Sequence, residues 1–354
     1  MARILMKGNE AIAEAAIQAG CRFFFGYPIT PQNQIPEYMS RRMPQVGGTF
    51  IQAESEVAAI NMVYGAAGAG ARVMTSSSSP GISLKQEGIS YICGAELPCL
   101  IVNMMRGGPG LGGIQPAQSD YYQSTRGGGH GDYRTVVLAP STVQEAVDMV
   151  ALGFDIADQY RLPTILCGDG MLGQMMEPVE MGCYIPRKLP EKTWATTGLH
   201  GRKKPNIINS LYIQAAELER VNARLSAVYD TIRKNEVDWE DYRTRDAELI
   251  LVAYGTTARI VKSAIARLAE EGIRVGLIRP KTLWPFPDVA FDKVIADGAK
   301  RFLSVEMSAG QMVDDIRLAV NGRAPVDFYG RTGGMIPTPR EIVEEVKKIL
   351  GGKA

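Results

Sequence analysis

Residues 134–167 read RTVVLAPSTVQEAVDMVALGFDIADQYRLPTILC and decide the fold class. Their apolar residues predict a strand over 134–138, an amphipathic helix over 143–158 and a second strand over 163–167. A helix that joins two short apolar strands is typical of a parallel crossover unit. We therefore expect an α/β protein built on a doubly wound, mostly parallel sheet with helices on both faces.

The residues upstream of this stretch repeat the same alternation. A helix is expected over 9–19, with Asn9 as its N-cap and Gly20 as its stop. Nearly every position of 56–69 holds a helix former. Further short strands are expected at 21–27, 72–75 and 98–104.

Downstream, the composition changes. Residues 185–206 are rich in proline, lysine and threonine, which predicts a linker, and a long polar helix is expected over 210–234. A second alternation then follows, with expected elements at 248–253, 256–271, 274–278, 301–305, 311–320, 326–329 and 339–350. We expect an α/β domain over 1–184, a linker with a long helix over 185–245, and a smaller α/β domain over 246–354.

Composition and charge are those of an ordinary globular protein. Of 354 residues, 45% are hydrophobic, and 39 basic residues balance 38 acidic ones to a net charge of +1. This balance gives no electrostatic reason to expect binding of nucleic acid or of an anionic membrane. The first residues lack the apolar run of a signal peptide, and no stretch has the ~20 apolar residues of a spanning helix. We therefore expect a cytoplasmic protein.

The five cysteines, at positions 21, 93, 99, 167 and 183, include no C-x-x-C pair. The chain is therefore not expected to build a zinc site or a ferredoxin-type cluster locally. Most of these cysteines lie in apolar runs and are expected to be small core residues. If the protein takes part in a redox reaction, the electrons must leave through another chain.

The first candidate site is GYPITP at 26–31, which follows an expected strand. In open α/β sheets, ligands bind beyond the carboxyl ends of the strands. The two prolines stiffen the turn and allow Thr30 to present its hydroxyl from a rigid position. The alternative is an ordinary turn whose threonine caps the next helix, and composition alone favours that alternative.

The second candidate is the pair Glu54 and Glu56, at the start of the helix expected over 56–69. On a helix these positions lie roughly 200° apart, so one carboxylate is expected in solvent while the other can point into a cleft. Small residues follow Glu56, which indicates a tightly packed helix. A carboxylate that opens such a helix is either a partner of the helix dipole or a placed acid.

Two loops offer polar groups. TSSSSPG at 75–81 combines hydroxyls and free amides after a strand, and a capped loop without a ligand is an equally good interpretation. RGGPGLGG at 106–113 begins with Arg106, whose guanidinium can bind a carboxylate through two parallel hydrogen bonds. A flexible lid is the alternative for this glycine-rich segment.

Gly168-Asp169-Gly170 is similar to the start of the motif that holds magnesium and the diphosphate of thiamine diphosphate. The asparagine that completes that motif is missing, because the next asparagine is Asn206, in the expected linker. We interpret Asp169 as turn chemistry after a strand, and we predict that this chain alone binds no metal.

Taken together, the motifs resemble one family. GYPITP at 26–31, AESE at 53–56, SSPG at 78–81 and RGGPGLGG at 106–113 are similar to the alpha subunit of 2-oxoacid:ferredoxin oxidoreductases. RPKTLWPFP at 279–287 resembles the second domain of the same family. The likeness covers nearly the whole chain in the expected order. It is greatest for the branched-chain (2-oxoisovalerate) type, and the 2-oxoglutarate type is the near neighbour.

The resemblance implies a division of labour between subunits. The alpha subunit would supply a pyrimidine-domain sheet for thiamine diphosphate and a second domain like the C-terminal domain of transketolase. A beta subunit would supply the diphosphate and Mg²⁺ site. A gamma subunit and a ferredoxin-like subunit with 4Fe-4S clusters would complete the complex. Coenzyme A would take the acyl group, and an external ferredoxin would take the electrons.

The resemblance also assigns roles to individual residues. Glu56 matches the glutamate that hydrogen-bonds to the pyrimidine ring nitrogen and thereby helps the cofactor act as its own base. Thr30 matches a hydroxyl that contacts the 2-oxoacid, and Arg106 matches the cation that pairs with its carboxylate. Ile29 and Ser79 would line the pocket.

Two other interpretations stay open. A thiamine-dependent decarboxylase or transketolase shares the expected fold but should carry a complete diphosphate motif, which this chain lacks. A non-catalytic scaffold subunit would keep the fold and would not need the carboxyl group of Glu56.

Overall fold

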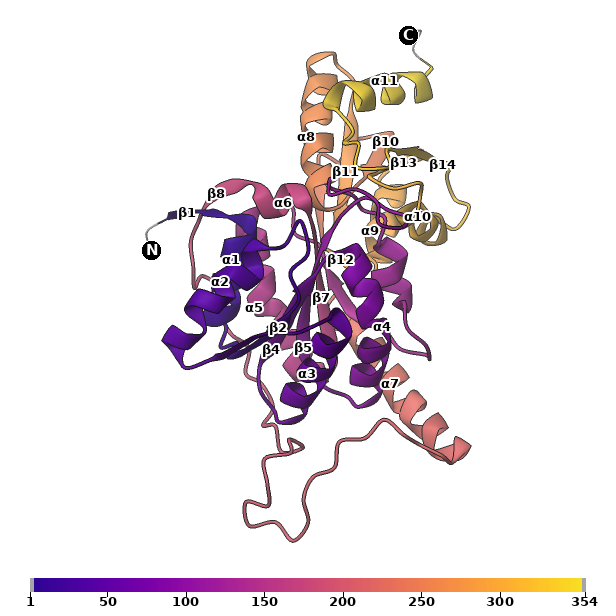
Figure 1. Cartoon of the computed structure of the whole chain (residues 1–354). Coiled ribbons are helices and arrows are strands. Elements are labelled where there is room, and N and C mark those ends of the chain that lie inside the picture. Colours follow the sequence, from indigo (N-terminus) through magenta and orange to yellow (C-terminus); the bar gives the residue numbers. More distant parts are fainter. Residues whose placement is uncertain (1–2, 352–354) are drawn as a thin grey trace.

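The computed structural model describes residues 3–351, which form two sheets of different size (Figure 1). The larger sheet has the strand order β12-β6-β7-β5-β4-β2-β3. All of its neighbouring strands are parallel except β12, which pairs antiparallel with β6. The predicted doubly wound, mostly parallel sheet is therefore confirmed. Its strands are β2 (Phe23–Gly26), β3 (Thr49–Gln52), β4 (Val73–Ser77), β5 (Cys99–Met105), β6 (Val136–Leu138), β7 (Pro163–Asp169) and β12 (Thr282–Trp284).

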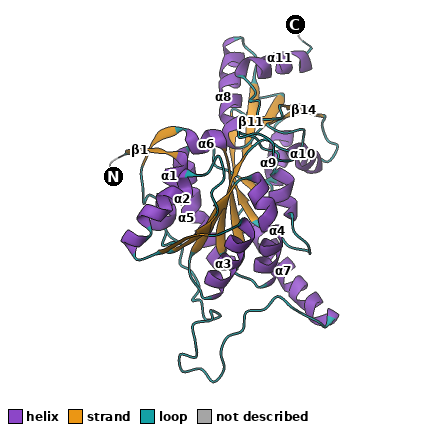
Figure 2. Ribbon diagram, in the orientation of Figure 1, coloured by secondary structure: helices purple, strands orange, loops and turns teal. Residues whose placement is uncertain are grey.

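Helices cover both faces of this sheet (Figure 2). α1 (Gly8–Gln18) packs against α2 (Gln34–Arg42) and α5 (Val143–Tyr160), and α3 (Glu56–Gly68) packs against α4 (Ser79–Gly94) on the opposite face. Every residue of β5 and β7 is buried, which explains why these strands read as continuous apolar runs. The unit also contains a 3-10 turn (Pro44–Val46), a π turn (Gln123–Gly127), α6 (Gly170–Gln174), and the antiparallel pair β1 (Ile4–Lys7) and β8 (Met176–Val179).

The smaller sheet has the strand order β14-β13-β10-β11-β9 and is parallel except for β9. Leu249 and Leu251 belong to a core shared with α8 and α11, whereas Ile250 and Val252 pack with α9 and α10 in the main core. Alternate residues of β10 thus face opposite layers. The elements are α7 (Ala215–Asn235), β9 (Trp239–Tyr242), β10 (Leu249–Val252), α8 (Gly255–Glu270), β11 (Val275–Pro280), α9 (Asp288–Ala296), β13 (Arg301–Glu306), α10 (Met312–Val320), β14 (Val326–Gly330) and α11 (Pro339–Ile349).

The two sheets exchange strands along the chain. β9 lies in the segment 185–245 but forms an edge of the smaller sheet, and β12 lies beyond residue 246 but forms an edge of the larger one. Residues 180–214 contain neither helix nor strand, and part of this segment projects from the lower side of the larger unit (Figure 2). Within residues 3–351, no helix combines the length and apolar character that crossing a bilayer requires.

Two local expectations are wrong. Asn9 is not the cap of α1, since Lys7 precedes the helix. Asn9 is instead buried in the first turn and donates hydrogen bonds to the carbonyl of Pro31 and to Oε1 of Gln34, both at 2.8 Å. The segment 75–81 is not a loop either, because β4 continues to Ser77 and α4 begins at Ser79, with a proline in its first turn.

Arg279, on β11, ties the smaller sheet to the larger unit. Its side chain is 2% exposed and forms ion pairs with Glu145 on α5 and Glu240 on β9, at 2.5 and 2.7 Å. Burial alone would raise the pKa of Glu145, but the hydrogen bond and charge of Arg279 outweigh it and hold this pKa below its usual value. The ion pairs therefore favour the charged carboxylate.

Replacing Arg279 with methionine should lower the free energy of unfolding by about 3 kcal/mol, because it leaves the partly buried carboxylate of Glu145 without a cation and leaves Glu240 with Lys262 alone. Urea denaturation of the purified protein would measure this loss. Arg317→Met removes an exposed ion pair with Asp314 and should cost under ~0.5 kcal/mol. Equal losses in the two variants would show that Arg279 does not hold the two units together.

Candidate active site

The predicted site residues lie at one edge of the larger sheet. The carboxyl ends of parallel strands meet at the same edge, where α/β proteins bind their ligands. Glu56 follows β3, the loop 27–31 follows β2, Ser79 follows β4, and Arg106 follows β5. These strands are neighbours in the order β5-β4-β2-β3. The fold therefore gathers at one edge the motifs that are separate in the sequence.

Glu56 is the first residue of α3 and is fixed there by a helix cap. The hydroxyl of Ser55 accepts a hydrogen bond from the amide of Ala58 at 3.2 Å, which satisfies one of the free N–H groups of the first turn. Glu56 is only 6% exposed, whereas Glu54 is exposed just outside the helix. One carboxylate is thus solvated and the other buried, as predicted, whereas the orientation of Glu56 into a cleft stays a prediction.

Close packing of α3 against α4 sets the position of the Glu56 carboxyl group. A Cβ atom at Gly81 would lie 2.6 Å from Oε1 of Glu56 and 2.0 Å from Oγ of Ser77. Two turns later, a Cβ atom at Gly88 would lie 2.5 Å from Cγ2 of Ile60. A side chain at either glycine would overlap its neighbours, so the close approach of the helices requires glycine.

Arg106 contacts two of the other predicted residues, Thr30 and Ser79. Its guanidinium donates to the carbonyl of Thr30 at 2.9 Å and to the carbonyl of Leu111 at 3.1 Å, and its backbone amide donates to Oγ of Ser79 at 3.0 Å. Thr30 is exposed and Ile29 is half-buried. The structure thus brings Thr30 and Ser79 each into direct contact with Arg106. The hydrogen bond between Arg106 and Thr30 is accepted by the backbone carbonyl of Thr30, so the hydroxyl of Thr30 takes no part in it.

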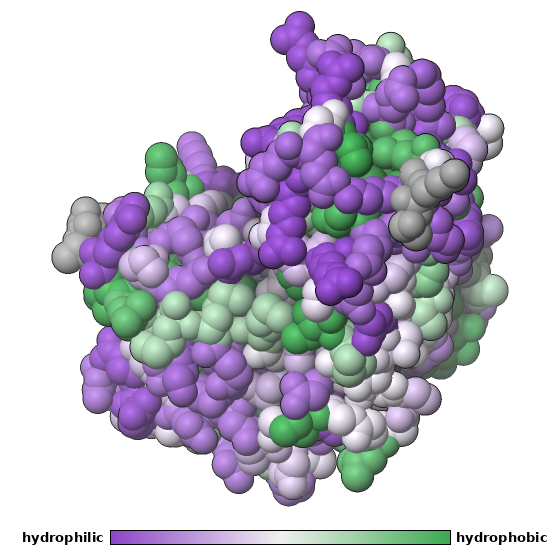
Figure 3. Space-filling model, turned by 90° about the horizontal axis from the view of Figure 1, so that it is seen from above, coloured by the Kyte–Doolittle hydropathy of each residue, from purple (hydrophilic) through white to green (hydrophobic). Residues whose placement is uncertain are grey.

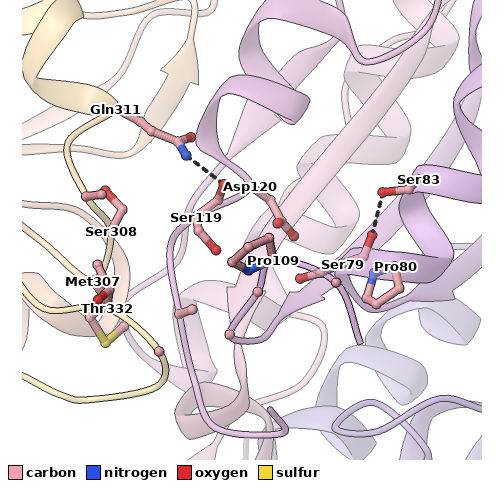
Figure 4. Close-up of a pocket in the computed structure, with 16 residues that line it drawn as sticks. Ser79, Pro80, Ser83, Pro109, Ser119, Asp120, Met307, Ser308, Gln311 and Thr332 are labelled. Atoms are coloured by element: carbon pink, nitrogen blue, oxygen red, sulfur yellow. Dashed lines mark hydrogen bonds between the residues drawn. The ribbon is translucent and has the colours of Figure 1, made fainter. Parts of the chain in front are cut away.

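A cavity of about 690 Å³ lies between the two units, next to Ser79 (Figure 4). Ser79 and Asp120 line it from the larger unit, and Met307 and Gln311 line it from the smaller one. The amide of Gln311 donates to the carbonyl of Ser119 at 2.8 Å and so joins the two walls. Burial raises the pKa of Asp120, although hydrogen bonds from Ser79 and from the amide of Asn103 partly offset this effect.

Sequence reasoning missed Lys85, a fully buried lysine on α4. Its amino group donates to Oγ1 of Thr75 at 2.7 Å and to the carbonyl of Ser76 at 3.0 Å. A signal was present, because Lys85 comes three positions after Ile82 and four before Ile89, on the apolar face of the helix. The burial of Lys85 could have been predicted only if a helix had been expected over residues 79–94.

Asp169 has the structural role that we predicted. Its Oδ1 accepts hydrogen bonds from the amides of Met171 and Leu172 at 2.9 and 3.0 Å, and its other oxygen accepts one from the hydroxyl of Thr256. These contacts cap α6 and bind it to α8. Among residues 3–351, no cluster of three or more His, Cys, Asp or Glu side chains is placed to hold a metal ion.

Two family models match the chain. Residues 14–239 match the thiamine-diphosphate-binding domain of pyruvate flavodoxin/ferredoxin oxidoreductases, and residues 247–342 match core domain II of pyruvate:ferredoxin oxidoreductase. The chain belongs to the 2-oxoacid:ferredoxin oxidoreductase family. It is an alpha-type subunit of an oxidoreductase that works as a complex, as its motifs predicted.

Individual relatives agree with this assignment. The ketoisovalerate oxidoreductase subunit VorB of Methanothermobacter thermautotrophicus is 50% identical over 353 residues, which cover 99% of each chain. The 2-oxoglutarate synthase subunit KorA of Methanocaldococcus jannaschii is 36% identical, over 96% of this chain and 98% of its own.

Solved structures resemble the chain as well. The 2-oxoglutarate:ferredoxin oxidoreductase of Magnetococcus marinus, solved with 2-oxoglutarate, coenzyme A and succinyl-CoA bound, has a TM-score of 0.87 at 29% identity. The match covers 98% of this chain and 65% of that one. A split-gene transketolase, 13% identical with a TM-score of 0.61, shares the fold.

The edge that carries Glu56 suits the thiamine diphosphate that this family binds. Oγ of Ser77, Oγ of Ser78 and Nε of Arg106 are buried there without a hydrogen-bond partner among the described residues. Unpaired buried polar atoms are costly in a folded protein unless a ligand or water satisfies them. Together with the inward-turned carboxyl group of Glu56, the two serine hydroxyls provide donors and acceptors for a polar heterocycle such as an aminopyrimidine.

Gly81→Ala should disturb this edge directly, because the added methyl group overlaps Glu56 and Ser77. We expect the free energy of unfolding to fall by about 1–3 kcal/mol, the usual cost of overpacking. Gly65→Ala is the matched control on α3: a Cβ atom there meets nothing within 4 Å, so the change should stabilise the helix by up to ~1 kcal/mol. Urea denaturation of both variants gives the comparison, and a neutral Gly81→Ala would contradict the packing argument.

Proposed function

We propose that this chain is the alpha subunit of a thiamine-diphosphate-dependent, cytoplasmic 2-oxoacid:ferredoxin oxidoreductase that acts on branched-chain 2-oxoacids. The reaction would convert 2-oxoisovalerate to its acyl-CoA, with release of carbon dioxide and reduction of ferredoxin. The substrate assignment is supported by the higher identity to the ketoisovalerate subunit, 50% against 36% for the 2-oxoglutarate subunit. A 2-oxoglutarate-specific enzyme is the alternative.

The observation that carries the proposal is the position of Glu56. When bound, thiamine diphosphate would supply both a thiazolium carbon as nucleophile and the imino nitrogen of its own pyrimidine as base. Glu56 would hydrogen-bond to the far nitrogen of that ring and exchange a proton with it. The role demands a carboxyl group held at one place with little access to water. A helix start packed against Gly81 at 6% exposure provides both conditions.

Arg106 and Thr30 would hold the 2-oxoacid. A guanidinium pairs with a carboxylate through parallel N–H groups, and Nε of Arg106 is a buried donor without a partner among the described residues. The carbonyls of Thr30 and Leu111 orient the other guanidinium nitrogens, so the side chain loses little entropy on binding. The Thr30 hydroxyl would contact the substrate, while Ile29 and Ser79 would line the pocket.

Partner subunits would supply the remaining chemistry. The incomplete Gly168-Asp169-Gly170 motif supports a beta subunit that holds the diphosphate and Mg²⁺. The cysteine spacing supports 4Fe-4S clusters on a ferredoxin-like subunit, with a gamma subunit completing the complex and coenzyme A as acyl acceptor. Exposed apolar side chains near the site suit a covering subunit: Leu111 is 86% exposed and Ile114 59%. The face shown in Figure 3 carries hydrophobic patches among hydrophilic ones.

Glu56→Ala should lower 2-oxoacid-dependent ferredoxin reduction by the assembled complex at least ~100-fold, the usual scale for a positioned acid–base group. Glu54→Ala is the control, since this neighbouring carboxylate is exposed, and its complex should keep full activity. A Glu56→Ala complex with normal turnover would instead identify the chain as a scaffold subunit.

The substrate assignment can be tested by comparing kcat/KM of the assembled complex for 2-oxoisovalerate, pyruvate and 2-oxoglutarate. We expect 2-oxoisovalerate to be preferred over pyruvate by at least ~10-fold, because one or two buried methyl groups contribute about 1–3 kcal/mol of discrimination. A preference for 2-oxoglutarate would select the alternative.

A further inference from the structure

Gln118 is a fully buried glutamine that the proposed reaction does not yet use. Its side-chain amide donates to the carbonyl of Tyr254 at 3.0 Å. Its Oε1 atom accepts hydrogen bonds from the hydroxyl of Thr257 at 2.9 Å and from the backbone amide of Met307 at 3.0 Å. The backbone amide of Gln118 donates to the carbonyl of Met307 at 2.8 Å, and its backbone carbonyl accepts a bond from the hydroxyl of Tyr254 at 3.2 Å.

All five bonds join Gln118 to the smaller unit. Tyr254 and Thr257 lie at the start of α8, and Met307 directly follows β13. A glutamine amide carries both a donor and an acceptor, and here both are satisfied away from water. An apolar side chain of the same size would leave three buried polar groups without a partner, which folded proteins avoid. Gln118 thus fixes its segment of the larger unit on the smaller one in a single orientation.

The segment that contains Gln118 is paired with the substrate arginine. Two positions before Gln118, Pro116 forms an antiparallel β-bridge with Arg106. The backbone amide of Gly107 donates to the carbonyl of Gln115 at 3.0 Å. The backbone at Arg106 is therefore joined to residues 115–118, which the smaller unit holds in turn.

Close backbone packing supports the same arrangement. Gly334, in the loop after β14, has a φ of +91°, and a Cβ atom there would lie 2.4 Å from Cβ of Gln115. A Cβ atom at Gly107 would lie 3.2 Å from the backbone of Gly333 and Gly334. The two loops are thus too close for a side chain at Gly334. The smaller unit therefore meets the segment 106–118 at two separate places.

We propose that Gln118 is a positioning residue through which the smaller unit holds Arg106 in place for the carboxylate of the 2-oxoacid. This inference rests on the proposed function. The carbonyls of Thr30 and Leu111 orient the guanidinium only while the backbone at Arg106 is correctly placed, and Gln118 controls that backbone. Glu56 is fixed instead by its packing against α4, so its contact with the cofactor does not depend on Gln118. The smaller unit thus contributes to substrate binding without touching the substrate.

Gln118→Met tests this role in the complete complex, because methionine has nearly the same volume but makes none of the three side-chain hydrogen bonds. The KM for 2-oxoisovalerate should rise and kcat/KM should fall by about 10- to 100-fold, the scale expected when a substrate-holding group is displaced by about 1 Å. The KM for coenzyme A and the dissociation constant of thiamine diphosphate, measured by calorimetry, should stay at their wild-type values. Arg259→Met is the matched control. It removes a 2.7 Å ion pair between α8 and Glu177 on β8, elsewhere between the units, and should leave all three values unchanged.

Gly334→Ala perturbs the same segment at the second contact. The added methyl group overlaps Gln115, so we expect the same selective rise in the KM for 2-oxoisovalerate. Gly322→Ala is its control, because the φ there is +72° but a Cβ atom meets nothing within 4 Å. This control carries a similar backbone strain without the overlap, and its KM should match that of the wild type.

A Gln118→Met complex with the wild-type KM for 2-oxoisovalerate would overturn the proposal. Equal rises in the KM values for 2-oxoisovalerate and coenzyme A, or a comparable loss in Arg259→Met, would also overturn it, because either result would show a general loosening between the units. If Gln118→Met fails to assemble, Gly334→Ala decides by the same criteria. A wild-type complex that oxidises no 2-oxoacid would refute the proposed function instead.

Discussion

The close approach of α3 and α4 is the constraint on which the site depends. Gly81 and Gly88 lie two turns apart on α4 and contact Glu56 and Ile60, which are one turn apart on α3. The two helices are therefore in contact along more than one turn, and the carboxyl group at the start of α3 is fixed by steric contact. Close packing of this kind restricts the position of the Glu56 carboxyl group more than a single polar contact would, because a close-packed interior has low compressibility.

Much of this arrangement could be predicted from sequence. The apolar runs located the central strands, and the rule that ligands bind at the carboxyl ends of strands pointed to the loop at 26–31. The roles of Glu56, Thr30, Ser79 and Arg106 came from the family resemblance. The contact between Arg106 and Thr30 could not be predicted, because it joins the backbone of one loop to the side chain of another. Only the folded chain brings those loops together.

Other features of the structure were not predicted from the sequence, for identifiable reasons. Four consecutive serines suggested a loop, and this concealed the start of α4 and, with it, Lys85 on the buried face. Asn9 has the side chain of a common N-cap, but tertiary contacts with Pro31 and Gln34 hold it inside the helix. β12 has only three residues and pairs with a strand far away in sequence, so no local pattern indicated it. In each case a long-range contact overrode a local preference.

The short strand β12 also determines how the polypeptide can be divided. The first family match ends at residue 239, and a gene fragment that stops there would lack Thr282–Trp284. The backbone groups of β6 that pair with this strand would then become an open sheet edge flanked by apolar side chains, a surface that promotes aggregation. The two matched regions thus differ in sequence signature but both contribute strands to the larger sheet. A soluble product would need residues from both.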